Sequence, residues 1–156
     1  MQIKLCEIND LESLTPLFDD YRQHFKQSSD PAAVKAYLQQ RIEANEAIIY
    51  LAHSGDEIHG FVMLYPSFSS IGLAPIWILN DMYLKSGSNK RLMALQLLDQ
   101  IVEDCKAAGA IRIEVTTRKE NHKLHKLYKD YGFEKDYKYD YYFLQVTQAA
   151  AADMLK

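Results

Sequence analysis

The feature that most constrains the fold is a strand, a basic turn and a helix between residues 75 and 109. Residues 75–84 form an apolar run with the composition of a buried strand, and residues 85–91 form a polar, basic turn. After the turn, apolar residues recur with the spacing of one buried helix face, at Ala94, Leu95, Leu97, Leu98, Ile101, Val102, Cys105 and Ala108. Gly109 follows where a helix favours a C′ glycine, so the helix is predicted to end there.

The start of this helix is suited to an anion. The first backbone N–H groups of a helix have no acceptor within the helix, and the helix dipole is positive at that end. Lys90 and Arg91 add positive charge at the same place. The sequence therefore predicts a ligand that carries phosphate.

Composition limits the classes of protein to which the chain can belong. At 156 residues it is long enough for one hydrophobic core and too short for two domains. A net charge of −3 gives no general attraction to nucleic acid. No apolar run approaches the ~18 residues of a membrane span, and the first residues lack the pattern of a signal peptide. Cys6 and Cys105 are interpreted as small core residues, so we expect a cytoplasmic protein.

The rest of the chain alternates between strand and helix patterns. A capping box at Asn9 and Glu12, the pair Asp30 and Pro31, and Asn121 each predict a helix start. The expected strands are residues 1–7, 47–53, 58–65, 75–84, 111–117, 133–137 and 140–146. The order β-α-α-β-β-β-α-β-α-β-β predicts a mixed sheet with helices on both faces, an α+β or α/β sandwich.

This order, together with local sequence patterns, resembles the GNAT superfamily of acetyl-CoA-dependent N-acetyltransferases over roughly residues 1–145. The most specific part is Asn121-x-x-Leu124-x-x-Leu127-Tyr128-x-x-Tyr131-Gly132-Phe133, with the strand of residues 77–84 and the Leu97-Leu98 pair. The resemblance implies a mostly antiparallel central sheet with a splayed pair of central strands. It also implies acetyl-CoA as co-substrate and an enzyme that is often a homodimer. Residues 65–70, ahead of residues 77–81, look like a bacterial branch near the polyamine and diamine acetyltransferases.

The pyrophosphate signature of that family, Gln/Arg-x-x-Gly-x-Gly/Ala, aligns with residues 89–94. Only Ala94 matches, because Asn89 replaces Gln or Arg and Leu92 replaces the first glycine. Backbone N–H groups come from any residue, so Leu92 need not abolish binding. The resemblance places the pyrophosphate on the whole run, Asn89, Lys90, Arg91, Leu92, Met93 and Ala94. The alternative is a basic helix start with no ligand.

The resemblance also assigns residues to the rest of the cofactor. The pantetheine arm would lie beside Met82, Tyr83 and Leu84, where their strand splays from residues 111–117. Asn121 would contact the cofactor in addition to capping its helix, and Leu127 would contribute a further contact.

Two residues are candidates for proton transfer. Asp81 is a charged residue in an apolar strand, where it is costly unless a cleft or partner receives it. We expect it to take the proton of a substrate amine, the alternative being an aspartate that only bonds backbone at a bulge. By resemblance, Tyr128 would donate a proton to the departing thiolate, since a phenol with a pKa of about 10 is protonated at neutral pH. The alternative is a packing tyrosine on the helix stripe.

The acceptor is predicted to arrive as a cation. Asp19 and Asp20 on the first helix would bind its remote charge, and Tyr65 and Trp77 would form an aromatic wall beside it. The same carboxylates would fit an ordinary helix surface. No metal site is expected, because no cysteine or carboxylate set accompanies His122 and His125.

These observations predict an N-acetyltransferase that transfers acetyl from acetyl-CoA to a primary amine by direct attack in a ternary complex. A small diamine or polyamine is the favoured acceptor. The rival interpretation is a non-catalytic CoA-binding regulatory module on the same fold, motivated by Asn89 and Leu92. A nucleic-acid binder and a membrane-associated protein are not expected.

Overall fold

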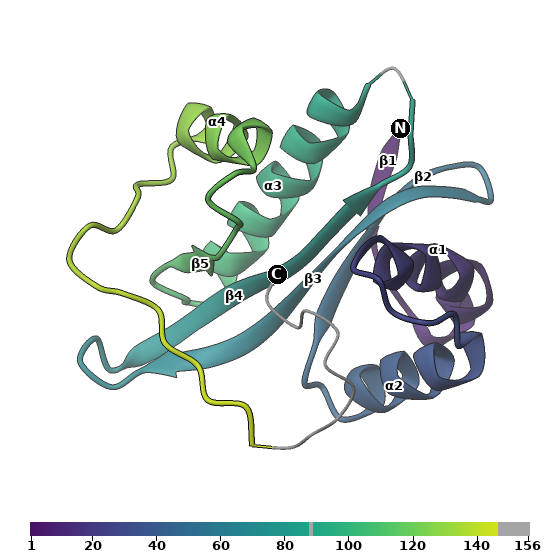
Figure 1. Ribbon diagram of the computed structural model, residues 1–156, viewed down its shortest axis with the longest axis horizontal. Coiled ribbons are helices and arrows are strands. Elements are labelled where there is room, and N and C mark those ends of the chain that lie inside the picture. The colour runs from purple at the N-terminus through teal and green to yellow at the C-terminus, as the bar shows by residue number, and fades with distance from the viewer. Residues whose placement is uncertain (88, 147–156) are drawn as a thin grey trace.

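The computed structural model describes residues 1–87 and 89–146. Ten elements follow one another along this part of the chain (Figure 1). They are β1 (Gln2–Leu5), the 3-10 helix η1 (Ile8–Asp10), α1 (Leu11–His24), α2 (Pro31–Glu43), β2 (Ile48–Ser54), β3 (Glu57–Ser69), β4 (Ala74–Leu84), α3 (Lys90–Ala107), β5 (Ile113–Val115) and α4 (His122–Tyr131). No helix among the described residues is long and apolar enough to cross a membrane.

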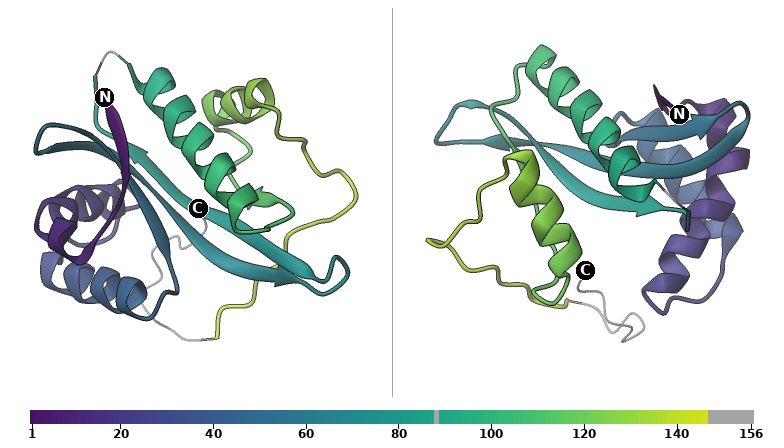
Figure 2. Two further views of the ribbon diagram at one scale, coloured as in Figure 1. Left: turned by 180° about the vertical axis from the view of Figure 1, so that it is seen from behind. Right: turned by 90° about the horizontal axis from the view of Figure 1, so that it is seen from above.

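The strands form one sheet in the order β1-β2-β3-β4-β5. The pairs from β1 to β4 are antiparallel, and β5 joins β4 in parallel. Helices α1 and α2 lie on one face of the sheet and α3 lies on the other, as Figure 2 shows. The predicted mixed, mostly antiparallel sheet with helices on both faces is therefore confirmed.

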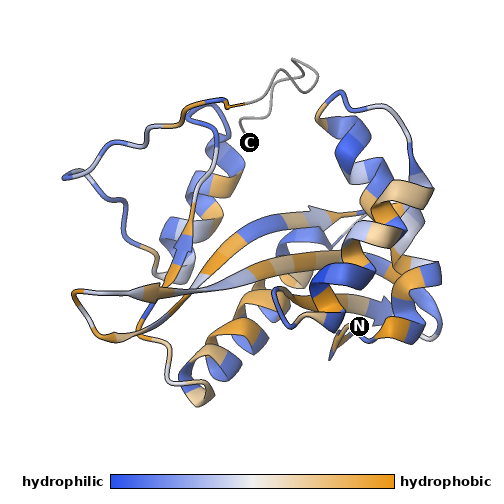
Figure 3. Ribbon diagram, turned by 90° about the horizontal axis from the view of Figure 1, so that it is seen from below, coloured by the Kyte–Doolittle hydropathy of each residue, from blue (hydrophilic) through white to orange (hydrophobic). Residues whose placement is uncertain are grey.

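Two apolar layers hold the helices against the sheet. The layer under α1 and α2 includes Phe18, Leu38 and Phe61, and the layer under α3 includes Trp77, Leu97 and Leu98. Figure 3 shows the apolar positions of the helices turned toward the sheet. The predicted helix periodicities identified these faces because burial of one stripe stabilises each amphipathic helix.

The helix ends agree with most of the sequence signals. The Asp30 carboxylate accepts from the Ala33 N–H at 3.0 Å and Asn121 accepts from the Leu124 N–H at 3.2 Å. Gly109 has a φ of 70°, the left-handed conformation of a C′ glycine. The capping box predicted at Asn9 is wrong, because Glu7 and Asp10 form it around η1.

The central strand contains a β-bulge at Asn80. Met63 of β3 pairs with Asp81, but the next residue, Leu64, pairs with Leu79, so Asn80 has no partner in β3. An extra residue reverses the alternation of side chains along a strand. Leu79 therefore packs in the α3 layer, whereas Asp81 turns toward α1.

The C-terminal strands predicted at residues 133–137 and 140–146 are wrong. Among the described residues no strand follows β5, and β5 spans only Ile113–Val115 instead of residues 111–117. The aromatic residues of this region have strand propensity, but a strand forms only against another strand edge. The chain after α4 is the yellow-green segment of Figure 1, and the view from above in Figure 2 shows it clear of the strands.

Candidate functional site

The two central strands part immediately beside the bulge. Residues Trp77 to Leu79 of β4 pair with Ile113 to Val115 of β5, and the pairing stops there. Beyond it, β4 continues to Leu84 with no β5 partner in the described part of the chain. This arrangement is the splay expected from the family resemblance, and it leaves strand backbone available to a ligand.

Asp81 lies just past the bulge and is buried, with 2% of its surface exposed. The Tyr21 hydroxyl donates to its Oδ1 at 2.6 Å, and the Asn80 amide donates to its Oδ2 at 2.8 Å. A buried carboxylate requires such donors, because desolvation without them is costly. Both of these donors are side chains, so the alternative of an aspartate bonded only to bulge backbone is not what the structure shows.

Tyr21 is a site residue that the sequence interpretation missed. It lies on the buried stripe of α1 with Leu14 and Phe18, where an apolar pattern predicts packing alone, yet its hydroxyl reaches β4. Burial raises the pKa of the Tyr21 phenol, and the nearby Tyr65 and Tyr128 phenols add to that effect. The phenol is therefore a neutral donor at physiological pH. The available signal was general: a buried tyrosine hydroxyl usually has a hydrogen-bond partner.

Tyr128 lies on α4 and is buried, with its ring 5.3 Å from that of Phe133. Burial raises its pKa to about 12, so it keeps its proton at neutral pH. Tyr128 thus packs against Phe133 and keeps the proton that the expected donor role requires.

The start of α3 retains features of an anion site. Asn89 is its N-cap but makes no side-chain capping hydrogen bond, and no acidic residue lies in the first turn. Lys90 is exposed, while Arg91 pairs with Asp130 of α4 at 2.9 Å. Leu92 is 54% exposed, so its side chain points outward instead of filling the core.

The other residues assigned to the cofactor divide between two faces and a groove. Met82 and Leu84 pack against the α3 layer together with buried Met93 and Ala94, and Tyr83 packs on the α1 side. Leu127 of α4 is buried in the α3 layer. An open cavity of about 590 Å³ lies at the start of α4, and the residues that line it are Arg118, Glu120, Asn121, His122 and Lys123.

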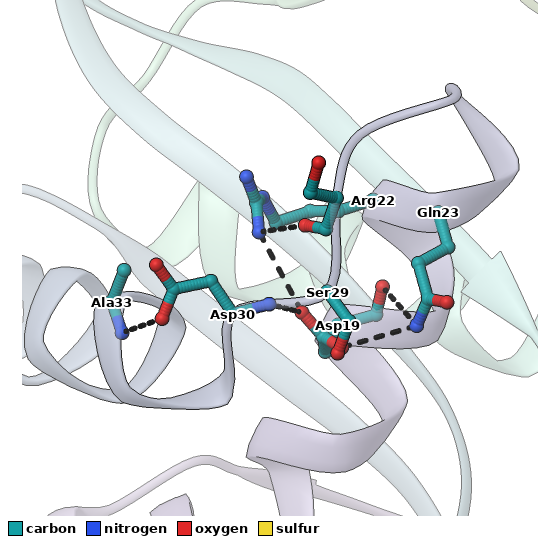
Figure 4. Close-up of polar contacts among 7 residues, drawn as sticks. Asp19, Arg22, Gln23, Ser29, Asp30 and Ala33 are labelled. Carbon is teal, nitrogen blue, oxygen red and sulfur yellow. Dashed lines mark hydrogen bonds and ion pairs between the residues drawn. The ribbon is translucent and has the colours of Figure 1, made fainter.

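Asp19 does not face a substrate site, and this corrects the sequence assignment. Its carboxylate accepts from the Ser29 hydroxyl at 2.6 Å, the Asp30 N–H at 2.9 Å and the Gln23 amide at 3.1 Å (Figure 4). Arg22 adds an ion pair at 3.6 Å. The Ser29 hydroxyl and the Asp30 amide lower the pKa of Asp19. This carboxylate fastens the loop that leads into α2.

The other predicted acceptor residues also separate. Asp20 is exposed on α1, as the prediction requires. Tyr65 is half-buried on the α1 side, and its hydroxyl lies 2.6 Å from that of Tyr37. Trp77 packs in the α3 layer, so its place in the aromatic wall is wrong, because the bulge at Asn80 puts it on the opposite face from Asp81.

A contact that the sequence did not predict, named here the Phe25 bridge, joins the β5–α4 loop to the end of α1. The Arg118 guanidinium lies 5.7 Å from the ring centre of Phe25, which connects the β5–α4 loop to the end of α1. His24, beside Phe25, has its ring 5.8 Å from that of Tyr83. No local pattern links residues this far apart in sequence.

The histidines of α4 do not form a metal site. The His125 Nε2 hydrogen-bonds to the Arg118 carbonyl oxygen at 3.0 Å, and the described residues contain no cluster suited to a metal ion.

Comparisons with known proteins agree with this geometry. The profile of the Acetyltransferase (GNAT) family matches residues 11–133. Uncharacterized N-acetyltransferase YhfO of Bacillus subtilis (strain 168) is 32% identical over 146 residues, which are 94% of this chain and 98% of that protein. The crystal structure of a probable acetyltransferase is 34% identical, covers 94% of this chain and 99% of its own, and superposes with a TM-score of 0.90.

A more distant structure shows the same fold. A predicted acetyltransferase from Clostridium acetobutylicum, solved with acetyl-CoA, has a TM-score of 0.72 at 14% identity, covering 91% of this chain and 95% of its own. The family match covers most of the chain, and the YhfO relative is matched along almost its whole length. The chain therefore belongs to the GNAT family of acetyltransferases.

Proposed function

We propose that this acetyltransferase transfers the acetyl group of acetyl-CoA to a primary amine by direct attack, with Asp81 and Tyr128 as its proton-transfer residues. The observation that carries the proposal is the buried hydrogen bond between Tyr21 of α1 and Asp81 of β4, beside the point where β4 and β5 part. Such a meeting of buried polar groups at a gap in the sheet suits proton transfer more than packing.

The residues present fit acetyl-CoA. The first turn of α3 offers unpaired N–H groups, Lys90 and no carboxylate, which favours a pyrophosphate. The unpaired length of β4 offers backbone groups to the amides of pantetheine, in the manner of an added strand. When bound, acetyl-CoA supplies a thioester whose carbonyl carbon is open to nucleophilic attack.

Each proton has an assigned destination. An amine that arrives as an ammonium ion must lose a proton before its nitrogen can attack, and Asp81 receives that proton. As the new C–N bond forms and the C–S bond breaks, the Tyr128 phenol protonates the departing sulfur. The second proton that the attacking nitrogen loses restores Tyr128, and Asp81 releases its proton to solvent. The net change releases one proton for each ammonium acetylated, without a covalent enzyme intermediate.

The proposed acceptor is a small diamine or polyamine. Asp19 is bonded to the α1–α2 loop, so the residues that support a cationic acceptor are the exposed Asp20 and the ring surface of Tyr65. Cationic groups bind such a combination by ion pairing and cation–π contact. A second candidate, an amine that carries its own carboxylate, is favoured by Arg118 at the Phe25 bridge.

An amine panel assayed by release of CoA thiol tests the reaction and the acceptor class together. Diamines and polyamines are compared with neutral and acidic amino acids at equal concentration. Turnover highest with diamines supports the acceptor proposed here, and turnover highest with acidic amino acids favours the Arg118 alternative. CoA binding by calorimetry without thiol release from any amine would instead support the non-catalytic binding module that Asn89 and Leu92 suggest.

A further inference from the structure

A series of contacts leads from the β5–α4 loop to the buried carboxylate of Asp81. At its outer end, the Arg118 guanidinium lies 5.7 Å from the ring centre of Phe25. The Phe25 ring meets the Tyr21 ring edge-on, with the two ring centres 5.1 Å apart. The Tyr21 hydroxyl then donates to Oδ1 of Asp81 at 2.6 Å. Three successive contacts therefore connect a loop, a helix and the central strand.

Phe25 lies at the C-terminal cap of α1, where a helix has little support of its own. Its N–H donates to the Arg22 carbonyl at 2.9 Å, the short turn with which helices often end. Lys26 follows with a φ of 60°, so the helix does not continue. Helix ends open more readily than helix centres, and neighbouring contacts decide where a side chain at such an end lies. For the partly buried Phe25 ring, these contacts include the Tyr21 ring and the Arg118 guanidinium.

Arg118 is held from the side of α4. Its backbone carbonyl accepts from the Asn121 N–H at 3.0 Å and hydrogen-bonds to the His125 Nε2 at 3.0 Å. Arg118 also lines the open cavity at the start of α4. Because its backbone is bonded to the first turn of α4 and its guanidinium contacts α1, this one residue ties the two helices together.

We propose that Arg118 is a positioning residue for Asp81, acting on it through the aromatic rings at the end of α1. By holding the Phe25 ring, the guanidinium keeps the Tyr21 hydroxyl within bonding distance of Asp81. A hydrogen bond weakens steeply as its length and angle depart from their optimum. A buried carboxylate that loses such a donor is harder to ionise. The consequence for catalysis rests on the proposed function of Asp81 as proton acceptor, whereas the contacts themselves do not.

The charge of Arg118 is a competing explanation, because a nearby cation lowers the pKa of a carboxylate directly. Both explanations predict that loss of Arg118 raises the pKa of Asp81. They differ for Phe25→Leu, which removes the ring and leaves the charge in place. The other titratable groups around the Tyr21–Asp81 bond are the same in every variant. They are His24 of α1, Tyr65 of β3, Tyr83 of β4 and Tyr128 of α4.

Carboxyl NMR measures the ionisation of Asp81 without turnover. The full chain is labelled with ¹³C at its aspartate carboxyl groups, and the Asp81 signal is the one missing from Asp81→Asn. Phe25→Leu and Arg118→Met are each expected to raise the pKa of Asp81 by about half a pH unit or more. Arg41→Met is the matched control, because it removes a guanidinium that lies 5.5 Å from the Tyr37 ring centre on α2. This control should leave the Asp81 titration unchanged.

The Tyr21→Phe background separates positioning from charge. Without the hydroxyl there is no bond to hold, so Phe25→Leu and Arg118→Met should cause no further rise in that background. A rise from Arg118→Met that persists there would show a direct effect of charge and overturn the inference. A folded Phe25→Leu variant with an unchanged titration, or an equal rise in Arg41→Met, would overturn it as well. The Arg118→Met comparison decides alone if circular dichroism shows that Phe25→Leu does not fold.

The pH–rate profile distinguishes this inference from the proposed reaction. With chemistry rate-limiting, the acid limb of kcat/KM in Arg118→Met should move to higher pH by the same amount as the Asp81 titration. A titration that moves while the limb stays would support the positioning by Arg118 and remove Asp81 as the base. A titration and a limb that both stay would overturn the positioning and leave the role of Asp81 standing.

Discussion

The Tyr21 hydroxyl and the Asp81 carboxylate lie 2.6 Å apart and join α1 to β4 across sixty residues of sequence. Phe18, Phe25, Phe61 and Tyr83 surround Tyr21, so the bond lies in an apolar environment. A hydrogen bond to the ionised form of a carboxylate favours that form, and burial opposes it. The balance between these effects sets the basicity of the proposed proton acceptor.

Tyr21→Phe is predicted to move the acid limb of the pH–rate profile to higher pH. The variant removes one donor from Asp81, so the ionised carboxylate is less stable and its pKa rises. Tyr50→Phe is the control, because it breaks another tyrosine–aspartate bond of 2.6 Å, the partly buried bond to Asp104 on α3. Both variants should lose about 1–3 kcal/mol of unfolding free energy, and only Tyr21→Phe should shift kcat/KM against pH. An unshifted profile would remove Asp81 as the base or Tyr21 as its positioning residue.

Tyr128→Phe is predicted to reduce turnover by ~10²-fold or more while changing the unfolding free energy little. The ring remains to pack on Phe133, and only the proton donor is lost. Because burial raises the pKa of Tyr128 to about 12, its ionisation should not reduce wild-type activity between pH 7 and about 10. Tyr131→Phe on the same helix, which loses a bond to Asp99, is the control and should keep its turnover. Equal turnover in the two variants, with chemistry rate-limiting, would exclude Tyr128 as the acid.

Asp19→Asn is predicted to change stability, whereas Asp20→Asn is predicted to change the KM for the acceptor. Asp19→Asn should lower the melting temperature at pH 7 and leave KM for a diamine unchanged. Its pKa is lowered in the folded protein, so its contribution to stability is complete above the unfolded pKa of about 4 and is lost as pH falls through the folded value. Melting curves of wild type and Asp19→Asn should therefore converge below pH 4.

Asp20→Asn should raise KM for the diamine more than it lowers kcat, with little effect on melting, because it removes ground-state binding. Asp56→Asn, in the exposed β2–β3 turn, controls for the general loss of one negative charge. The comparison is steady-state kinetics with one diamine. A KM equal to that of Asp56→Asn would contradict the role of Asp20.

Gly60→Ala is predicted to destabilise the fold by about 1–3 kcal/mol through overpacking. A Cβ on this β3 residue would lie 2.4 Å from the Leu84 Cδ2 and 2.9 Å from the Tyr83 carbonyl oxygen. Gly87→Ala is the control, because its Cβ would have nothing within 4 Å. Urea unfolding measures the stability of both variants. Equal midpoints would contradict the prediction, because they would show that β4 shifts to accommodate the Cβ without loss of unfolding free energy.

The sequence predicted the order of elements from β1 to α4, because helix caps and apolar periodicity act locally. It also identified Asp81 and Tyr128 as candidate site residues, the first as a charge in an apolar strand and the second by resemblance. It did not predict that Tyr21 contacts Asp81, since nothing in a helical stripe specifies which strand its hydroxyl will reach.

The incorrect assignments have three physical sources. The family resemblance places Trp77 beside the acceptor, but the bulge at Asn80 leaves Trp77 on the α3 face and turns Asp81 to the other. Asp19 was assigned to substrate because its carboxylate was assumed to be exposed, whereas donors from Ser29 and Asp30 satisfy it. The C-terminal strands were predicted from propensity alone, and propensity does not supply the neighbouring edge that a strand needs.

The bulge at Asn80 makes the spacing of β4 as important as its composition. If Asn80 paired with Met63 as in a regular ladder, every side chain named in the site would still be encoded, but alternation would turn Asp81 toward α3 and Met82 toward α1. A charge would then enter an aliphatic layer, and the phenol of Tyr21 would lose its acceptor. For evolution and for protein engineering, deletion of Asn80 would therefore close the bulge without changing which face Asp81 occupies, and would remove the Asn80 amide that donates to its Oδ2.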